Sequence, residues 1–281
     1  MGEMTFENGH DARSFYTHVQ KYLKEAGHRS DIQLIEDSHC IKIIYGSLTG
    51  DSFNNMKLAF WEYITGAKWD EWFRTLLQET YYFSDQAEQQ QIIDIMHSIL
   101  EGDRRELSVF LGQNGAEGYV KESIGQMLRE GTAFSFDSFV KFRLRPFFDY
   151  MEEVAALSID EYKMEQEYLI FIESLREFVQ GRPARMELLH VLAGEEITFY
   201  DEKLVEIRRA ELVKMIDRKL LINHPVYVDS YSIAPLLSIA PAAIHLYAEE
   251  PEVPLIRTIL NIFEERVELH KPADFPGHAC I

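Results

Sequence analysis

The stretch that decides the fold is Ser230–Ala248, which reads Ser-Tyr-Ser-Ile-Ala-Pro-Leu-Leu-Ser-Ile-Ala-Pro-Ala-Ala-Ile-His-Leu-Tyr-Ala. It carries no Asp, Glu, Lys or Arg over 19 positions, close to the roughly 20 apolar residues that a membrane-spanning helix needs. Pro235 and Pro241 argue against one continuous helix, because proline removes a backbone hydrogen-bond donor. We interpret the stretch as a buried helix, a proline turn at Ala240–Pro241 and a buried strand, and we expect no membrane span. A single span is the alternative interpretation.

Further strand and helix signals surround this stretch within residues 182–281. Two apolar runs flank Gly194 and predict a hairpin. Helices are expected before and after the decisive stretch, and a short strand ends the pattern. In chain order, the predicted elements are strands 186–192 and 197–200, helices 202–219 and 230–238, strand 243–247, helix 255–265 and strand 267–270. The segment is therefore predicted to hold a small mixed sheet.

The preceding residues, 67–181, have a helical pattern almost throughout. Apolar residues recur at helical spacing, and glycines follow several of these runs. Pro146 lies inside the run Phe136–Ala156, where it either kinks one helix or opens a second one. Ser158-Ile159-Asp160-Glu161 has the pattern of a capping box and predicts that another helix begins there.

The first 66 residues have a mixed pattern. Apolar residues between Phe15 and Ala26 recur on one helical face. The runs 32–35 and 41–45 predict a hairpin, and a helix is expected over 52–65. The whole chain is therefore predicted to be a mainly helical α+β protein. Its N-terminal α/β segment (1–66), helical segment (67–181) and C-terminal α/β segment (182–281) pack as one domain or as two, and both α/β ends can belong to one sheet or to separate sheets.

Composition and charge exclude several classes of protein. The 281 residues contain 28 Lys and Arg against 47 Asp and Glu, a net charge of −19. This surplus of acid argues against nucleic acid as a partner and against adsorption to an anionic membrane. Cys40 and Cys280 form no disulfide framework. Met1–His10 lacks the basic and apolar regions of a secretory signal, so we expect a cytoplasmic protein with reduced thiols.

A glycine-containing loop is the candidate phosphate site. Gly112, Gly115 and Gly118 follow the apolar run Val109–Leu111 and precede a predicted helix. A strand, a glycine turn and a helix start would aim free amides at an anion. However, the spacing is not that of a dinucleotide-binding motif, and the Lys-Ser/Thr pair of a P-loop is missing. The simpler interpretation is a loop between helices.

His190, His245 and Asp201 are the candidate catalytic residues. Both histidines lie in predicted strands, and Asp201 ends the neighbouring hairpin arm. If these strands adjoin, a His–Asp pair could transfer protons; the alternative is that each histidine is a partly buried structural residue. None of the short motifs of zinc proteases, serine hydrolases, P-loop proteins or EF-hands is present.

The C-terminal tail holds the candidate metal ligands His270, His278 and Cys280. Imidazole and thiolate suit zinc, but this spacing matches no standard zinc pattern, and a closed site needs four ligands. We therefore expect no cofactor, and metal binding by the tail is the alternative interpretation.

Three stretches of the chain are distinctive as a set. They are Phe139–Leu144 with Asp160–Tyr162 and Glu167–Ile172, then Ser238–His245, then Thr258–Phe263 leading to Arg266-Val267. With these stretches the chain resembles the YtxC family of sporulation proteins of endospore-forming bacteria. The resemblance covers roughly residues 105–270 and includes no catalytic motif.

This resemblance implies a cytosolic protein of a sporulating Gram-positive bacterium, and the family supplies no established activity. Together with the missing catalytic motifs, it favours a sporulation-associated protein that acts through protein–protein contacts without catalysis. The alternative is an enzyme that binds a small ligand or a metal near His190, Asp201 and His245, or at the tail.

Overall fold

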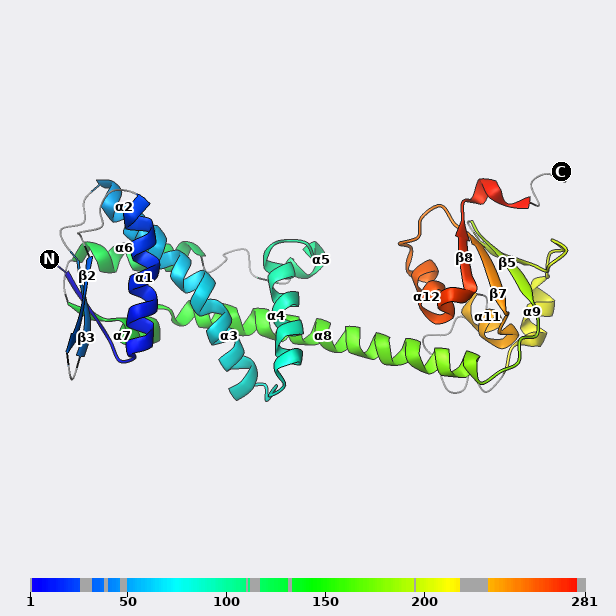
Figure 1. The fold of residues 1–281 in the computed structure, drawn as a ribbon, viewed down its shortest axis with the longest axis horizontal. Coiled ribbons are helices and arrows are strands. Elements are labelled where there is room, and N and C mark those ends of the chain that lie inside the picture. The colour runs from blue at the N-terminus through cyan, green and yellow to red at the C-terminus, as the bar shows by residue number, and fades with distance from the viewer. Residues whose placement is uncertain are drawn as a thin grey trace. The chain divides into compact units, whose positions relative to one another are not determined.

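A computed structural model of the chain shows the fold in Figure 1. It describes residues 2–25, 32–37, 40–45, 50–109, 111, 117–130, 133–194, 196–217 and 232–276. The chain divides into two compact units, Met1–Met164 and Glu165–Ile281. The boundary lies inside the helix α8 (Arg145–Gln180), which therefore contributes residues to both units.

The N-terminal unit contains a sheet in the order β2-β3-β1-β4. The hairpin of β2 (Ile32–Asp37) and β3 (Cys40–Tyr45) is the one predicted from the sequence. β1 (Gly2–Phe6) pairs antiparallel with β3 and parallel with β4 (Phe134–Ser135). The sequence does not reveal β4, because a strand of two residues is too short to show a period of two.

Helices make up the rest of this unit. They are α1 (Gly9–Glu25), α2 (Gly50–Glu62) with its π-helical extension η2 (Tyr63–Ala67), α3 (Lys68–Glu79), α4 (Gln86–Leu100), α5 (Arg105–Ser108), α6 (Glu117–Glu130), α7 (Phe136–Arg143) and the first part of α8. Pro146 is the second residue of α8, so it opens a second helix and does not kink one. Its missing N–H costs nothing there, since the first turn of a helix has free amides.

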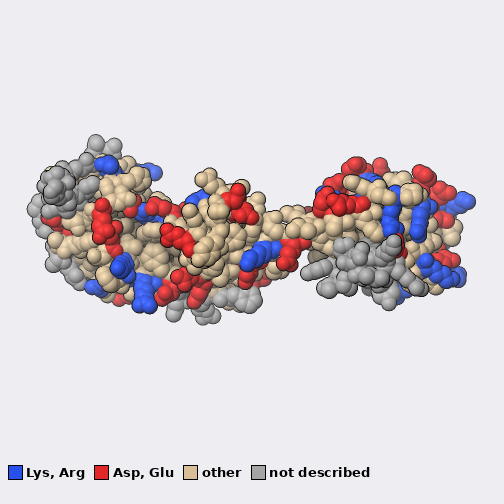
Figure 2. All heavy atoms as spheres, turned by 90° about the horizontal axis from the view of Figure 1, so that it is seen from below, with Lys and Arg blue, Asp and Glu red and all other residues tan. Residues whose placement is uncertain are grey.

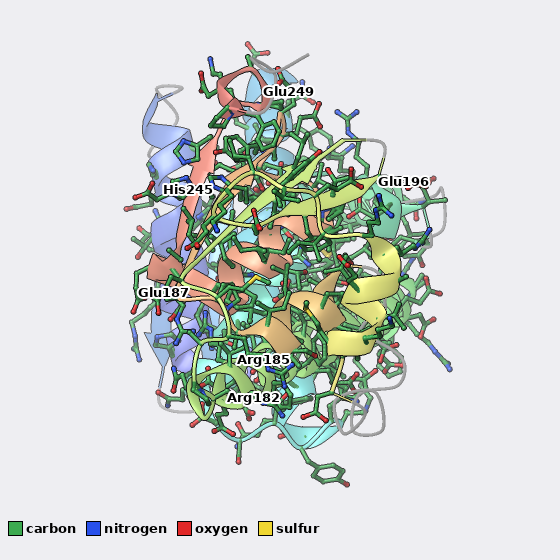
Figure 3. All side chains as sticks on the ribbon, turned by 90° about the vertical axis from the view of Figure 1, so that its right-hand side faces the viewer. Arg182, Arg185, Glu187, Glu196, His245 and Glu249 are labelled. Atoms are coloured by element: carbon green, nitrogen blue, oxygen red, sulfur yellow. The ribbon has the colours of Figure 1, made fainter. Side chains whose placement is uncertain are left out.

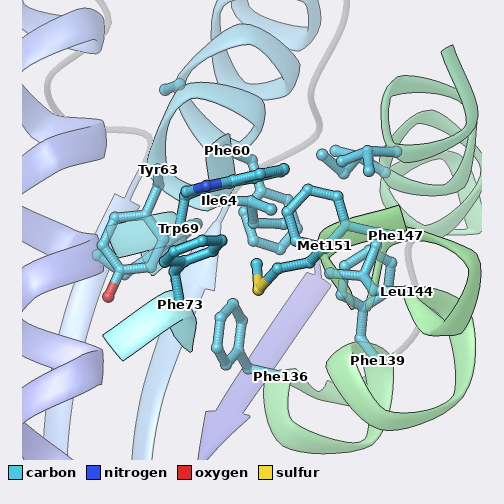
Figure 4. Close-up of a cluster of buried hydrophobic side chains, with 14 of the residues drawn as sticks. Phe60, Tyr63, Ile64, Trp69, Phe73, Phe136, Phe139, Leu144, Phe147 and Met151 are labelled. Atoms are coloured by element: carbon cyan, nitrogen blue, oxygen red, sulfur yellow. The ribbon is translucent and has the colours of Figure 1, made fainter. Parts of the chain in front are cut away.

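The core of this unit is rich in aromatic rings (Figure 4). Phe15 contacts Phe60 edge-on at 4.9 Å between ring centroids, and Phe6 stacks on Phe136 at 4.9 Å. Trp69 meets Phe147 of α8 edge-on at 4.8 Å. Offset and edge-to-face pairs of this kind add stabilisation beyond the area that they bury. The rings therefore fix the N-terminal half of α8 against the helices that precede it.

The C-terminal unit contains a mixed sheet in the order β6-β5-β7-β8. β5 (Leu188–Ala193) pairs antiparallel with β6 (Ile197–Tyr200), as the hairpin signal around Gly194 predicts. β5 also pairs parallel with β7 (Ala243–Tyr247), which pairs parallel with β8 (Val267–His270). The predicted mainly helical α+β class is confirmed, and the two ends of the chain form separate sheets.

Helices cover one face of this sheet. Buried residues of β5 and β7 on that face share a hydrophobic core with α8, α11 (Ile233–Ile239) and α12 (Pro254–Phe263). Shorter helical elements complete the unit: α9 (Arg209–Met215), η3 (Glu264–Arg266) and η4 (Pro272–Asp274). The opposite face of the sheet carries the polar side chains described below.

The decisive stretch folds as predicted from residue 232 onward, whereas residues 230–231 lie outside the described residues. Every residue of α11 is buried, and Ala240 ends the helix in the left-handed conformation with a φ of 46°. Pro241 follows, and β7 begins at Ala243. Among the described residues, no helix is long and apolar enough to cross a membrane.

The capping-box prediction at Ser158 is wrong. α8 runs without interruption from Arg145 to Gln180, and Ser158 is fully buried inside it. The Ser158 hydroxyl donates to the carbonyl of Val154 at 2.8 Å, so it is satisfied within the helix and caps nothing. Burial of Val154, Ala155 and Ile159 in the N-terminal core continues the helix through the capping sequence.

The helix predicted over 202–219 is also wrong at its start, and residues 218–219 lie outside the described residues. Asp201 Oδ1 accepts hydrogen bonds from the amides of Lys203 and Val205, both at 2.9 Å. An aspartate that binds the amides following it offers the backbone a turn in place of a helix. α9 consequently begins only at Arg209.

A buried lysine links two helices of the N-terminal unit. The exposed fraction of the Lys68 side chain is 3%, and its ammonium donates to Asp11 at 2.9 Å and to Glu71 at 2.7 Å. Burial alone lowers the pKa of this lysine, but the two carboxylates outweigh burial, and its net pKa is raised. Most other charged side chains lie on the surface, where acids and bases are interspersed on the face drawn in Figure 2.

Replacing Lys68 with alanine should lower the free energy of unfolding by about 3 kcal/mol, because Asp11 would keep its charge in a site only 15% exposed. Urea unfolding followed by circular dichroism measures the loss. The exposed Lys163 provides the matched control, and Lys163→Ala should change stability by less than about 0.5 kcal/mol. Equal effects of the two substitutions would contradict the structural role of this ion cluster.

His18 of α1 is a second partly buried ionisable group. Burial lowers the pKa of its imidazole, and Lys21 lowers it further, against the opposing effects of Glu62 and the Ala59 backbone. Its Nε2 atom is buried without a hydrogen-bond partner, and the ring of Tyr63 lies 5.7 Å away. Folding therefore favours the neutral form of this histidine more than the unfolded chain does.

Stability should decrease as the pH falls below about 6.5, because the unfolded chain then binds a proton that folded His18 resists. Phenylalanine at position 18 keeps a ring and removes the titration. The urea midpoint of His18→Phe should therefore change less than that of the wild type between about pH 7.5 and pH 5.5. The same substitution at His10, which is 82% exposed, is the control and should keep the wild-type pH dependence. The prediction fails if His18→Phe also keeps the wild-type pH dependence.

Candidate functional site: the polar face of the C-terminal sheet

The alternation of the strands builds one polar face on the C-terminal sheet. In β5, Leu189 and Val191 point into the core, so His190 between them lies on the other face. In β7, Ile244 and Leu246 are fully buried, and His245 and Tyr247 alternate with them. The same period places Glu268 and His270 of β8 together. Figure 3 labels Glu187, which precedes β5, His245 of β7, and Glu249, which follows β7.

The pairing register brings these residues side by side. His190 of β5 lies opposite His245 of β7, which lies opposite Glu268 of β8. One step further along the same face, Tyr247 lies opposite His270. Residues directly opposite on neighbouring strands are close enough for their side chains to interact. The register therefore assembles a site from residues that are up to 80 positions apart in the sequence.

His190 forms the buried end of this face. It is 6% exposed, and its Nδ1 shares a hydrogen bond of 3.0 Å with the Tyr247 hydroxyl. Burial lowers the pKa of His190, and the neighbouring His245 and His270 lower it further, while Asp201 acts in the opposite direction. The His190 ring contacts that of His245 at 5.1 Å between centroids. His190 is therefore a buried, hydrogen-bonded residue beside the more exposed groups, and its surroundings favour the neutral imidazole.

His245, Glu268 and His270 form the accessible end. Glu268 Oε2 lies 3.3 Å from His245 Nε2 and 3.6 Å from His270 Nε2. The candidate ligand atoms of the three residues all lie within 4.8 Å of one another. The exposed fractions of the side chains are 30% for His245, 70% for Glu268 and 32% for His270. Two imidazoles and a carboxylate thus converge on one point at the sheet surface.

Aromatic rings border the cluster. The ring of Tyr247 stacks on those of His190 and His270, at 5.9 Å and 5.2 Å. Phe275, from the segment after β8, packs on Tyr247 at 5.1 Å and on Tyr200 of β6 at 4.8 Å. Phe275 is 5% exposed, so this segment is anchored on the polar face. The ring of Tyr247 therefore packs against two of the histidines, and Phe275 packs against Tyr247.

The structure brings together some of the residues singled out in the sequence. His190 and His245 adjoin as the strand prediction required, but the hydrogen-bond partner of His190 is Tyr247, and Asp201 Oδ1 is engaged in its turn. His270 joins the same face, whereas His278 and Cys280 lie outside the described residues.

The glycine loop lacks the strand expected before it at the described positions. Val109 and Leu111 lie outside any strand, after α5. Gly118 is the second residue of α6, and Gly112 and Gly115 fall outside the described residues. Where the structure describes this segment, it therefore has the form of a connection between helices.

Sequence reasoning missed Tyr247, Glu268 and Phe275. A signal for the first two was present, because the period of two in 243–247 and 267–270 places His245 with Tyr247 and Glu268 with His270. These two pairs meet because β7 and β8 are neighbours in the sheet. That pairing is a long-range contact, and no local sequence pattern predicts it. Phe275 follows the last strand and carries no local signal.

The fold and this face define a class: an α+β protein of two units whose C-terminal mixed sheet presents histidines, a carboxylate and tyrosines on one side. The chain belongs to the YtxC-like family, which matches residues 54–268. It is 35% identical to the "Uncharacterized protein YtxC" of Bacillus subtilis (strain 168) over 269 residues, 96% of this chain and 94% of that protein. No solved structure matches the chain.

Removing the Tyr247 hydroxyl tests the buried end of the site. Tyr247→Phe should lower the free energy of unfolding by about 1–3 kcal/mol, because His190 Nδ1 would lose its partner in a buried position. Thermal unfolding measures the effect. Tyr200→Phe removes the hydroxyl of a half-buried tyrosine of β6 in the same way and should have a smaller effect. Equal unfolding temperatures for the two variants would contradict the assigned hydrogen bond.

Proposed function

We propose that this chain is a cytosolic, sporulation-associated protein that acts through contacts with a protein partner. The resemblance to YtxC sporulation proteins supports the cellular role. The single observation that carries the contact role is the exposure of apolar residues within a family-distinctive stretch. Leu169 and Ile170 of Glu167–Ile172 are 56% and 69% exposed. Core packing does not account for large apolar side chains in such a position.

These residues border a groove between two helices of the C-terminal unit. The groove has a volume of about 420 Å³ and is lined by residues between Tyr168 and Arg176 of α8 and by Asn261 of α12. Asn261 belongs to Thr258–Phe263, another of the stretches that carry the resemblance. Two family-distinctive segments, about 90 residues apart in the sequence, thus meet at one surface.

Polar contacts fix the shape of this groove. The Asn261 side-chain amide donates to the Tyr168 hydroxyl at 3.1 Å, and Arg176 donates to the Asn261 carbonyl at 2.6 Å. Arg176 also pairs with Glu264 at 2.7 Å. A preformed apolar surface with a polar rim is the usual anatomy of a protein interface.

The occupant that we propose is a partner segment with apolar side chains. It belongs to a protein that is basic or neutral, because this chain is strongly acidic.

The test compares two double substitutions that place acids at exposed apolar positions of the same unit. Leu169→Glu with Ile170→Glu alters the groove border, whereas Val205→Glu with Val213→Glu alters positions that are 60% and 52% exposed outside it. A gene that encodes each double variant replaces the native gene in the organism that carries this chain. We expect the groove variant to reduce the count of heat-resistant spores as far as a gene deletion does, and the control to match the wild type.

A photo-crosslinking residue at position 170 measures the contact itself. We expect one crosslinked protein during sporulation, and we expect the Leu169→Glu substitution to abolish that crosslink. A probe at the exposed Glu211 of α9 serves as the control and should not capture the same protein. A gene deletion without effect on sporulation would refute the cellular role, and a groove variant with normal spore counts would refute the contact surface.

A further inference from the structure

We infer that His245, Glu268 and His270 form a binding site for a divalent first-row transition metal ion, with zinc as the reference ion. The site is distinct from the α8 groove and does not depend on the function proposed above. It also differs from the tail set His270, His278 and Cys280, because all three of its ligands come from the strands β7 and β8 and only His270 belongs to both sets. The ligand chemistry, the distances and one unsatisfied nitrogen carry the inference.

The distances fit a tetrahedral ion. Zinc binds imidazole nitrogen and carboxylate oxygen at about 2.0–2.2 Å, so two ligand atoms of one tetrahedral ion lie about 3.4 Å apart. Glu268 Oε2 lies 3.3 Å and 3.6 Å from the Nε2 atoms of His245 and His270. All the ligand atoms lie within 4.8 Å of one another. Glu268 already has the required spacing to both imidazoles, so a small approach of the two imidazoles would close the triangle around an ion.

The Nε2 atom of His270 supplies an independent indication. It is shielded from solvent and makes no hydrogen bond. A buried polar atom without a partner costs free energy, and in native proteins such an atom calls for a partner such as an ion. This atom faces the carboxylate of Glu268, where a bound cation would contact both groups. The same atom would then be satisfied by coordination.

The ligand set indicates which ions suit the site. Imidazole and carboxylate together favour zinc and its neighbours over Mg²⁺ and Ca²⁺, which prefer oxygen ligands alone. Two histidines and one glutamate are also a ligand set of catalytic zinc sites, in which the fourth position remains open to water. The exposed position of Glu268 at the sheet surface is consistent with such access. Tyr247 stacks on His270 and binds His190, so it holds one ligand in orientation.

The test uses the full-length chain after removal of metals with a chelator. Zinc is titrated in competition with a chromogenic chelator, and cobalt is titrated separately because its visible spectrum reports tetrahedral coordination. We expect one zinc ion per chain and a tetrahedral cobalt spectrum. Neither Mg²⁺ nor Ca²⁺ in excess should displace the zinc.

Single substitutions identify the ligands. His245→Gln, Glu268→Gln and His270→Gln should each weaken zinc binding at least about 100-fold, since even the loss of an outer-shell partner costs about 10–100-fold. His10→Gln removes an imidazole that is 82% exposed and lies outside the cluster, and it should leave the affinity unchanged. Glu268 is 70% exposed, so Glu268→Gln should also keep the thermal stability of the metal-free chain. A loss of affinity in this variant cannot then be a failure to fold.

Two outcomes would overturn the inference. One is a full-length chain that binds no zinc under competition. The other is binding that survives all three strand substitutions but is lost in the double variant His278→Gln with Cys280→Ser, which would place the ion at the tail.

Discussion

The parallel pairing of β5, β7 and β8 is the constraint on which the C-terminal unit depends. This pairing sets His190 opposite His245, and His245 opposite Glu268. A slip of β7 by one residue would turn the whole strand over and bury its polar side chains in place of Ile244 and Leu246. The apolar core on the helical face therefore fixes the register, and the register in turn fixes the geometry of the polar face.

Parallel strands also explain why the site is assembled from distant parts of the chain. Two parallel neighbours need a crossover between them, and here α12 lies between β7 and β8 in the sequence. Each crossover helix packs its apolar side on the same face of the sheet. On the opposite face, the segment of η4 and Phe275 after β8 covers part of the sheet, where Phe275 packs on Tyr247.

The sequence predicts the elements of this unit better than it predicts their associations. The charge-free stretch predicts α11, the turn at Pro241 and β7, because burial and proline chemistry are local signals. Ser158 and Asp201 mislead for opposite reasons. Tertiary burial continues α8 through the capping sequence at Ser158, whereas the Asp201 side chain forms a turn in a segment with helical composition. The partnership of His245 with Glu268 and His270 depends on strand order, which composition and spacing do not contain.

The two surfaces proposed for this unit are physically separate, and that separation has a consequence for how they can work. Ile172 and Leu175 of α8 pack into the core beneath the sheet, while Leu169 and Ile170 of the same helix are exposed. The histidines lie on the far face of the sheet, beyond that core. A partner seated on the α8 groove would therefore leave Glu268 accessible, and an ion bound by Glu268 would leave the groove open. Any coupling between the groove and the metal site would have to pass through β7. This strand carries His245 on one face and buried core side chains on the other.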